Sequence, residues 1–283
     1  MKLSSLLKLT LGLALAAAPI LPASADITDQ ARKVHADHEA SVFGIRGIIK
    51  INATMNGAAA GNQETEIWNN GILIGKGLVM TAYRAISPDF SSQQRPGLVI
   101  ESEIAELNLV DSSGEEFAAK LILHDEDLGV AFIAIDPHGE KAADFKGTPV
   151  DISKDPEISL LQELVSVGRY NSSMRFVSSL RTAAVTGIVK RPRKKYAISG
   201  IPVGQSAMTA DGELVGLVVT HSEKGKSGAI AVVLPTQYIR DLMPQATEKQ
   251  AELANAPAEK DETEEAEEEK SEEPAIEADP GKE

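Results

Sequence analysis

Residues 75–86 read Gly-Lys-Gly-Leu-Val-Met-Thr-Ala-Tyr-Arg-Ala-Ile, and the run from Leu78 to Ala82 is typical of a short β-strand. The run is apolar, and glycine precedes it, as expected where a turn enters a strand. The same pattern recurs from Val42 to Val233 with turn signals such as Asp211-Gly212 between the runs. The predicted strands are Val42–Ile51, Glu66–Ile74, Leu78–Ala82, Glu106–Val110, Glu116–Leu123, Val130–Ile135, Leu164–Val167, Phe176–Val189, Gln205–Met208, Leu214–Thr220 and Ala229–Val233.

Regular short strands separated by turns predict an all-β architecture, either a sandwich or a pair of barrels. A span of about 200 residues suits two six-stranded barrels, at about 40–140 and about 155–235. Helices are predicted at Ala25–Glu39, in an N-terminal helical segment over 26–39, and at Pro235–Leu242. The chain shows no internal repeat of the length that marks solenoids or propellers.

Composition excludes several classes of function. The 283 residues contain no cysteine, which excludes disulfides, thiolate zinc sites, iron–sulfur clusters and cysteine nucleophiles. Aromatic residues make up 4% of the chain, with Trp68 as the single tryptophan, so stacking platforms for nucleic acid are not expected. No metal-binding constellation stands out, and we expect no cofactor.

Residues 1–25 have the pattern of a secretory signal peptide. Lys2 and Lys8 give a positive start, an apolar stretch runs from Leu9 to Leu21, and Ala23-Ser24-Ala25 is a small-x-small cleavage site. The apolar run is shorter than the ~20 residues of a spanning helix. We therefore expect an exported protein of a bacterial periplasm or the extracellular space, with no transmembrane segment after cleavage; a retained anchor is the alternative.

Residues 246–283 form an acidic tail with 15 acidic residues and 4 lysines. Its net charge is −11 of the chain's −14, and residues 26–245 carry only −5. The tail has almost no branched aliphatic residues, so it cannot bury enough apolar surface to offset the cost of ordering and is predicted to be disordered. It is either a solubilising tail or a docking segment for a basic partner.

Six segments, in chain order, carry a resemblance to a known family: Gly75–Ile86, Glu106–Lys120, Asp127–Ile133, Val185–Val189, Asp211–Gly216 and Ala229–Gln245. Together they resemble the protease domain of the HtrA (Do-like) type of trypsin-like serine proteases, over roughly residues 40–245. Asp127-Leu128-Gly129-Val130, for example, is similar to the family's Asp-Leu-Ala-Val, which carries the triad aspartate. The resemblance implies a trypsin-like double six-stranded β-barrel with a short C-terminal helix. We expect no counterpart of the family's PDZ domain, because the predicted acidic tail follows the closing helix directly.

The resemblance fails at the catalytic positions. In the trypsin-like mechanism a serine attacks, a neutral histidine removes its proton and a buried aspartate orients the histidine. The aspartate matches Asp127, but Arg84 stands at the histidine position, and a guanidinium cannot accept a proton. A gap-free count places Val203 at the serine position, whereas a three-residue gap places Ser206 there. The triad is not intact, and we expect Arg84 and Asp127 to form a partly buried salt bridge instead.

A basic run lies ahead of the degenerate nucleophile segment. It comprises five cations in six residues, Lys190, Arg191, Arg193, Lys194 and Lys195. In a trypsin-like topology this run falls in a loop at the rim of the former cleft. It is either a solvated loop or a binding site for an acidic partner or for the chain's own acidic tail; a nucleic-acid ligand is not expected in an exported, net acidic protein.

The sequence therefore predicts a trypsin-like fold without protease chemistry. We expect a peptide or partner protein to bind in the former active-site cleft, in a regulatory role in the bacterial envelope. The alternative is an active serine endopeptidase with Ser206 as nucleophile and His124 or another histidine as base. A third possibility is an electrostatic tether that uses only the basic run and the acidic tail.

Overall fold

The computed structural model describes residues 26–90, 95–222 and 229–257. The predicted signal peptide at 1–25 and residues 258–283 of the predicted tail lie outside these ranges. Among the described residues, no helix has both the length and the apolar character needed to cross a membrane.

The first barrel is built from the N-terminal strands. Its antiparallel strands close in the order β1-β2-β3-β6-β5-β4, which confirms one six-stranded barrel. The strands are β1 (Val42–Met55), β2 (Ala58–Gly75), β3 (Leu78–Ala82), β4 (Leu98–Val110), β5 (Glu116–Asp125) and β6 (Val130–Ile135). A four-residue helix, α2 (Tyr83–Ile86), follows β3 directly.

The second barrel closes in the order β10-β11-β12-β9-β8-β7. Its strands are β7 (Glu163–Arg169), β8 (Ser178–Val189), β9 (Lys195–Ile198), β10 (Ser206–Met208), β11 (Leu214–Ser222) and β12 (Ala229–Pro235). The sequence missed β9, because its four residues begin inside the basic run. Pairing with both β8 and β12 holds this short strand in place. The double-barrel prediction is confirmed.

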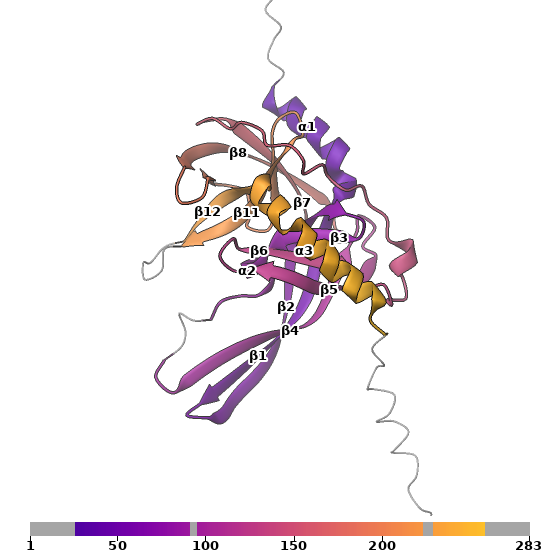
Figure 1. The fold of residues 1–283 in the computed structure, drawn as a ribbon, viewed down its shortest axis with the longest axis vertical. Coiled ribbons are helices and arrows are strands. Elements are labelled where there is room, and N and C mark those ends of the chain that lie inside the picture. The colour runs from indigo at the N-terminus through magenta and orange to yellow at the C-terminus, as the bar shows by residue number, and fades with distance from the viewer. Residues whose placement is uncertain (1–25, 91–94, 223–228, 258–283) are drawn as a thin grey trace, which may run out of the picture.

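Three strands of the first barrel extend beyond the predicted ends. β1 and β2 remain paired from Val42↔Ile72 to Met55↔Ala58, and β4 pairs along the other side of β1 as far as Leu98. The extension projects from the body of the molecule as a three-stranded arm (Figure 1). The start of β2, Ala58-Ala59-Ala60-Gly61, is a poor β-former, so the partner strand rather than local preference fixes its conformation.

Helices close both ends of the described chain. Asp26 caps α1 (Ile27–His38), whose Ala31 and Val34 are buried; a 3-10 helix, η1 (Glu39–Ser41), then leads into β1. Two further 3-10 helices are η3 (Ala142–Asp144) and η4 (Ser172–Met174). At the other end, α3 (Thr236–Asn255) runs across both barrels (Figure 1).

The predicted boundary between closing helix and tail is wrong. We expected the helix to end at Leu242 and disorder to begin at Ala246, but α3 continues to Asn255. Ala246 is 0% exposed, and Gln250 donates a hydrogen bond of 2.7 Å to the carbonyl of Lys76. Apolar packing of Ala246 and Leu253 against the core and two polar contacts with the first barrel, at Lys76 and His138, thus hold this polar segment in place.

One hydrophobic cluster joins the two barrels. It contains Phe132 of β6, Val165 of β7, Val219 of β11 and Ile239 of α3. Each barrel also has a smaller apolar cluster of its own. The barrels and α3 thus share a continuous core, and the region between the barrels is where the predicted site residues must be examined.

Candidate functional site

The three positions predicted to correspond to the triad, Arg84, Asp127 and Val203, lie on segments that meet between the barrels. The N–H of Tyr83 at the end of β3 donates to the carbonyl of Gly129, 2.9 Å away, which ties the Arg84 segment to the Asp127 turn. A Cβ placed on Gly129 would lie 3.5 Å from Cβ of Val219, so that turn also abuts β11. Val203 packs against the core on the second-barrel side.

Arg84 does not pair with Asp127. Its guanidinium instead lies 3.7 Å from the carboxylate of Asp89, with both side chains substantially exposed, and 5.7 Å from the ring centroid of Tyr83. Asp127 is itself exposed and has no ion pair within the described residues. The predicted buried salt bridge is therefore wrong. An ion pair between exposed side chains contributes little free energy, so Arg84 has little to gain from Asp127. It lies instead near Asp89, five residues along its own segment.

The two candidate nucleophile positions have different surroundings. Val203 is half-buried in the turn that precedes β10. The next residue, Gly204, has a φ of +93°, and a Cβ there would collide with Oδ1 of Asn69, so glycine is required at this point. Ser206 lies within β10 and is 2% exposed, and its Oγ has no hydrogen-bond partner among the described residues. A substrate carbonyl cannot reach this hydroxyl as the strand stands.

The histidines are engaged elsewhere. The ring of His124 stacks on Tyr83 with centroids 4.2 Å apart. His35 contacts the hydroxyl of Ser178 at 2.6 Å, and His138 contacts the carbonyl of Ala256 at 2.8 Å. His221 lies 3.2 Å from Nζ of Lys195. Because the Oγ of Ser206 has no partner, no histidine is in place to act as its base.

Sequence analysis missed an open strand edge beside these positions. The N–H of Val218 donates to the carbonyl of Gln205, and the carbonyl of Val218 accepts from Gly204, each at 2.9 Å. On this side β11 is therefore paired as far as Val218. The polar groups of Thr220 point the same way, because backbone groups alternate along a strand. Among the described residues, Val219–Ser222 pairs only with β12, on the opposite side.

The basic run forms the turn between β8 and β9, together with the first residue of β9. Lys190, Arg191 and Arg193 are exposed, whereas Lys194 and Lys195 are half-buried. Burial lowers the pKa of Lys195, and the neighbouring Arg193 lowers it further. The pKa of Lys194 is raised, mainly by a hydrogen bond with Tyr196. We call Lys190–Lys195 the basic turn.

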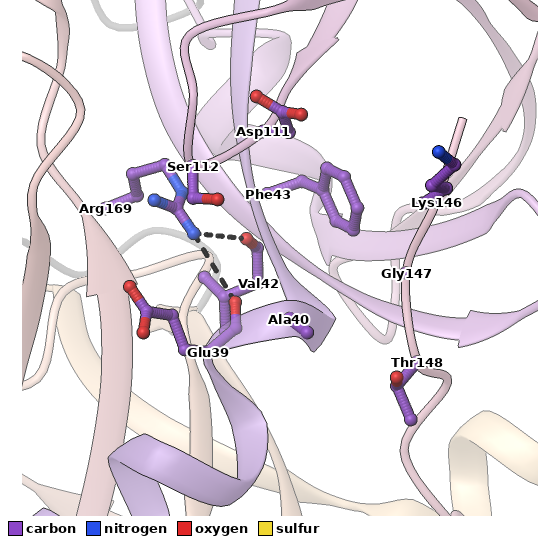
Figure 2. Close-up of a pocket in the computed structure, with 10 residues that line it drawn as sticks. All are labelled: Glu39, Ala40, Val42, Phe43, Asp111, Ser112, Lys146, Gly147, Thr148 and Arg169. Atoms are coloured by element: carbon purple, nitrogen blue, oxygen red, sulfur yellow. Dashed lines mark hydrogen bonds between the residues drawn. The ribbon is translucent and has the colours of Figure 1, made fainter. Parts of the chain in front are cut away.

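A pocket of about 450 Å³ lies at a different place, where η1, the β4–β5 turn and the end of β7 meet (Figure 2). Its notable residue is Arg169, which is 3% exposed. The guanidinium donates to the carbonyls of Val42 at 3.1 Å, Glu39 at 3.4 Å and Phe176 at 2.9 Å. Burial lowers the pKa of Arg169, with partial opposition from the negative charges of Glu39 and Asp111.

Arg169 acts as a tie between the barrels. Its backbone N–H donates to Oδ1 of Asn70 at 2.5 Å, and its carbonyl accepts from Nε1 of Trp68 at 3.2 Å, so β7 is bonded to β2 as well as to η1 and β1. Its guanidinium nitrogens Nη1 and Nη2 are occupied by carbonyls, and Nε is enclosed without a partner. This arrangement explains a structural role for the side chain and leaves the open edge of β11 as the better candidate for function.

The comparisons with known proteins leave the family open: no family model matches this chain, and no curated protein matches its sequence. Within the described ranges, no group of three or more histidine, aspartate or glutamate side chains is placed to hold a metal ion.

Proposed function

We propose that this chain is a non-catalytic relative of the HtrA-type proteases that binds an extended peptide segment of a partner protein along the open edge of β11. The observation that carries the proposal is the pairing of β11, which stops at Val218 on the side facing the Val203 turn. Beyond it, the N–H and C=O of Thr220 lack a partner among the described residues, and its side chain is exposed.

An open edge in this place is suited to strand addition. An extended peptide that pairs with a free edge gains backbone hydrogen bonds, and alternate side chains give specificity. Proteins usually cover or shorten such edges because they otherwise pair with unwanted chains. The edge lies next to Val219 of the shared core, which abuts Gly129, so a bound strand would also lie near the Asp127 turn.

The chemistry of the site supports binding without cleavage. Arg84 cannot remove a proton, Val203 has no nucleophilic atom, and Ser206 is buried with no base beside it. These observations support the proposal over a peptidase that uses Ser206. An exported location in the bacterial envelope rests on the signal-peptide pattern of residues 1–25 and is part of the same proposal.

The test removes one backbone donor from the edge. Thr220→Pro deletes the N–H that faces the open side and keeps the ladder with β12, because Thr220 directs its polar groups away from that strand. Thr220→Ala is the matched control, since it also loses the side chain but keeps the N–H. Phage-displayed random decapeptides would be selected on the full chain and then measured on each variant.

We expect selected peptides to bind the wild type and Thr220→Ala alike, and to lose roughly tenfold or more in affinity for Thr220→Pro. Selection of no peptide, or equal binding to Thr220→Pro, would overturn the proposal. Fluorophosphonate labelling and casein cleavage test the chemistry separately. Labelling that disappears in Ser206→Ala would show a live peptidase and refute the non-catalytic part.

A further inference from the structure

We propose that the acidic segment Glu259–Glu273 of this chain binds its own basic turn, Lys190–Lys195. The docking is an intramolecular charge interaction and does not depend on the proposed peptide binding. Its consequence for the β11 edge, given below, does rest on that proposed function.

The first step is that the basic turn lacks counter-charges. None of its five cations lies within 4.0 Å of a carboxylate among the described residues, whereas Arg46 alone contacts Glu66, Glu106 and Glu116. Asp155 and Glu157 act on Lys194 only at longer range, and Asp155 is already bonded to Arg240. Like charges held together in one turn repel each other, so an anionic ligand would stabilise this turn.

The second step is that α3 connects the two partners. Tyr238, near the start of the helix, accepts the backbone N–H of Lys194 at its hydroxyl, 2.9 Å away. The whole helix has 20 residues, a length of about 30 Å, and ends at Asn255. At its far end His138 of the first barrel contacts the carbonyl of Ala256. The acidic segment therefore begins about one helix length from the basic turn.

The third step is reach. An extended chain covers about 3.3 Å per residue, so roughly ten residues after Asn255 are enough to return along α3. The acidic segment starts four residues after Asn255 and continues for 15 residues. Its second half, from Glu265 onward, can lie over the basic turn without any movement of the helix.

The fourth step is charge. Glu259–Glu273 contains 10 acidic residues and 2 lysines, a net charge of −8. Because the segment is covalently joined to α3, its charge stays close to the basic turn. This connection raises the effective concentration of the segment at the turn above that of a free acidic ligand. Exposed charges are screened beyond about 8 Å at physiological salt, so the docking should weaken steeply as salt rises.

Docking has a consequence for the open edge. Lys195, the last cation of the basic turn, lies 3.2 Å from the ring of His221, and His221 directly follows Thr220 on β11. The basic turn lies on the far side of β12 from the open edge of β11, two strand spacings (~10 Å) away, so a tail held on the basic turn would be within reach of the edge proposed to receive a peptide. We therefore expect the tail to compete with peptide binding.

The experiment uses a carbodiimide, which joins a lysine amine to a carboxylate only when the two are in contact. The full chain would be cross-linked at about 0.02 M and about 0.5 M salt and the products mapped by mass spectrometry. Lys190→Glu/Arg193→Glu reverses two exposed charges of the basic turn. Lys33→Glu/Arg181→Glu reverses two exposed cations elsewhere that have no ion pair with a described residue, and is the matched control.

We expect cross-links from Glu259–Glu273 to Lys194 and Lys195 at low salt. Their yield should fall roughly tenfold at high salt and in Lys190→Glu/Arg193→Glu, but not in the control. Equal labelling of lysines over the whole surface, or no effect of the reversal, would overturn the docking. Cross-linking a mixture of heavy-isotope-labelled and ordinary chains distinguishes binding within one chain from binding between two chains. Links between differently labelled chains would assign the site to a second copy and refute the intramolecular form.

A second variant separates this proposal from the proposed function. The chain ending at Pro257 keeps every described residue and removes the acidic segment. We expect it to bind the selected peptides more tightly than the full chain does. If the cross-links are found but truncation leaves peptide affinity unchanged, docking stands and its effect on the edge is refuted. If truncation has no effect and the cross-links are also absent, the docking fails while the peptide site is untouched.

Discussion

Arg169→Ala is the substitution whose effect follows most directly from the structure. The side chain is 3% exposed and holds the carbonyls of Glu39, Val42 and Phe176, which belong to η1, β1 and the β7–β8 connection. Removing it leaves these carbonyls without that donor and opens a void at the pocket. The side-chain bonds to the N-terminal segment are lost with it, whereas the backbone bonds of residue 169 to Asn70 and Trp68 remain.

The expected magnitude comes from the number of bonds. Three hydrogen bonds at about 1 kcal/mol net each predict a loss of about 3 kcal/mol in the free energy of unfolding. The stem of the arginine adds a smaller packing contribution, whereas relief of the buried charge and of the unpartnered Nε acts in the opposite direction. For a domain of this size the loss corresponds to a melting temperature lower by about 6–12 °C.

Urea unfolding followed by tryptophan fluorescence is a suitable assay. Trp68 is the single tryptophan, and its ring nitrogen donates to the carbonyl of Arg169, so the probe reports on the same contact between the barrels. Circular dichroism on the same samples follows both barrels. Arg175→Ala is the control, because Arg175 is an exposed arginine nearby and its loss should change stability by less than about 0.5 kcal/mol. A loss below about 1 kcal/mol in Arg169→Ala would refute the role of a tie.

Three further outcomes are expected. Ser206→Ala removes a buried hydroxyl that has no partner among the described residues, so the melting temperature should stay the same or rise. Ser166→Ala breaks the 3.0 Å hydrogen bond to Gln205 and should lower the melting temperature. The reverse order of the two melting temperatures would contradict this reasoning. Arg84→Ala should change the free energy of unfolding by less than about 0.5 kcal/mol in a denaturant titration, because its ion pair is exposed; a loss of several kcal/mol would restore the buried pair. The hydrogen bond from Arg240 lowers the pKa of Asp155, so Asp155 stabilises the fold above its unfolded pKa of about 3.9, and this stability is lost as pH falls through the lower folded pKa. Thermal unfolding should therefore show Asp155→Asn below the wild type at pH 7, with a gap that narrows as pH falls below the unfolded pKa, and an undiminished gap in acid would be inconsistent with this linkage.

The fold class could be predicted because it depends on local pattern. Strands such as β3 and β6 are short apolar runs between turn residues, and the observed strands match the predicted bounds Leu78–Ala82 and Val130–Ile135. In both strands the apolar side chains favour burial, so the local pattern was enough to predict the strand. The strand count came out one short because β9 is defined by its neighbours β8 and β12 and not by its own composition.

The positions at which strands and α3 end depend on the elements that pair or pack with them rather than on the local sequence. The arm of β1, β2 and β4 extends because β1 pairs on both sides as far as Met55. α3 extends because Ala246 and Gln250 find contacts on the first barrel, more than 100 residues earlier in the chain. The prediction that disorder begins at Ala246 rests on the composition of the segment, which carries no information about contacts with distant residues. The predicted start of the tail was therefore too early in the chain.

Within the candidate site, sequence alone determined that Arg84 cannot accept a proton and that Val203 carries no nucleophilic atom, because these are properties of the side chains themselves. It also determined the charge of the basic run and of the acidic segment, because charge is a property of the residues themselves. Tertiary structure alone decided that Arg84 turns to Asp89, that Ser206 is enclosed and that no described strand pairs with the second side of β11 beyond Val218. Those features depend on distances between segments that lie far apart in the chain, and such distances exist only once the two barrels have closed and packed together.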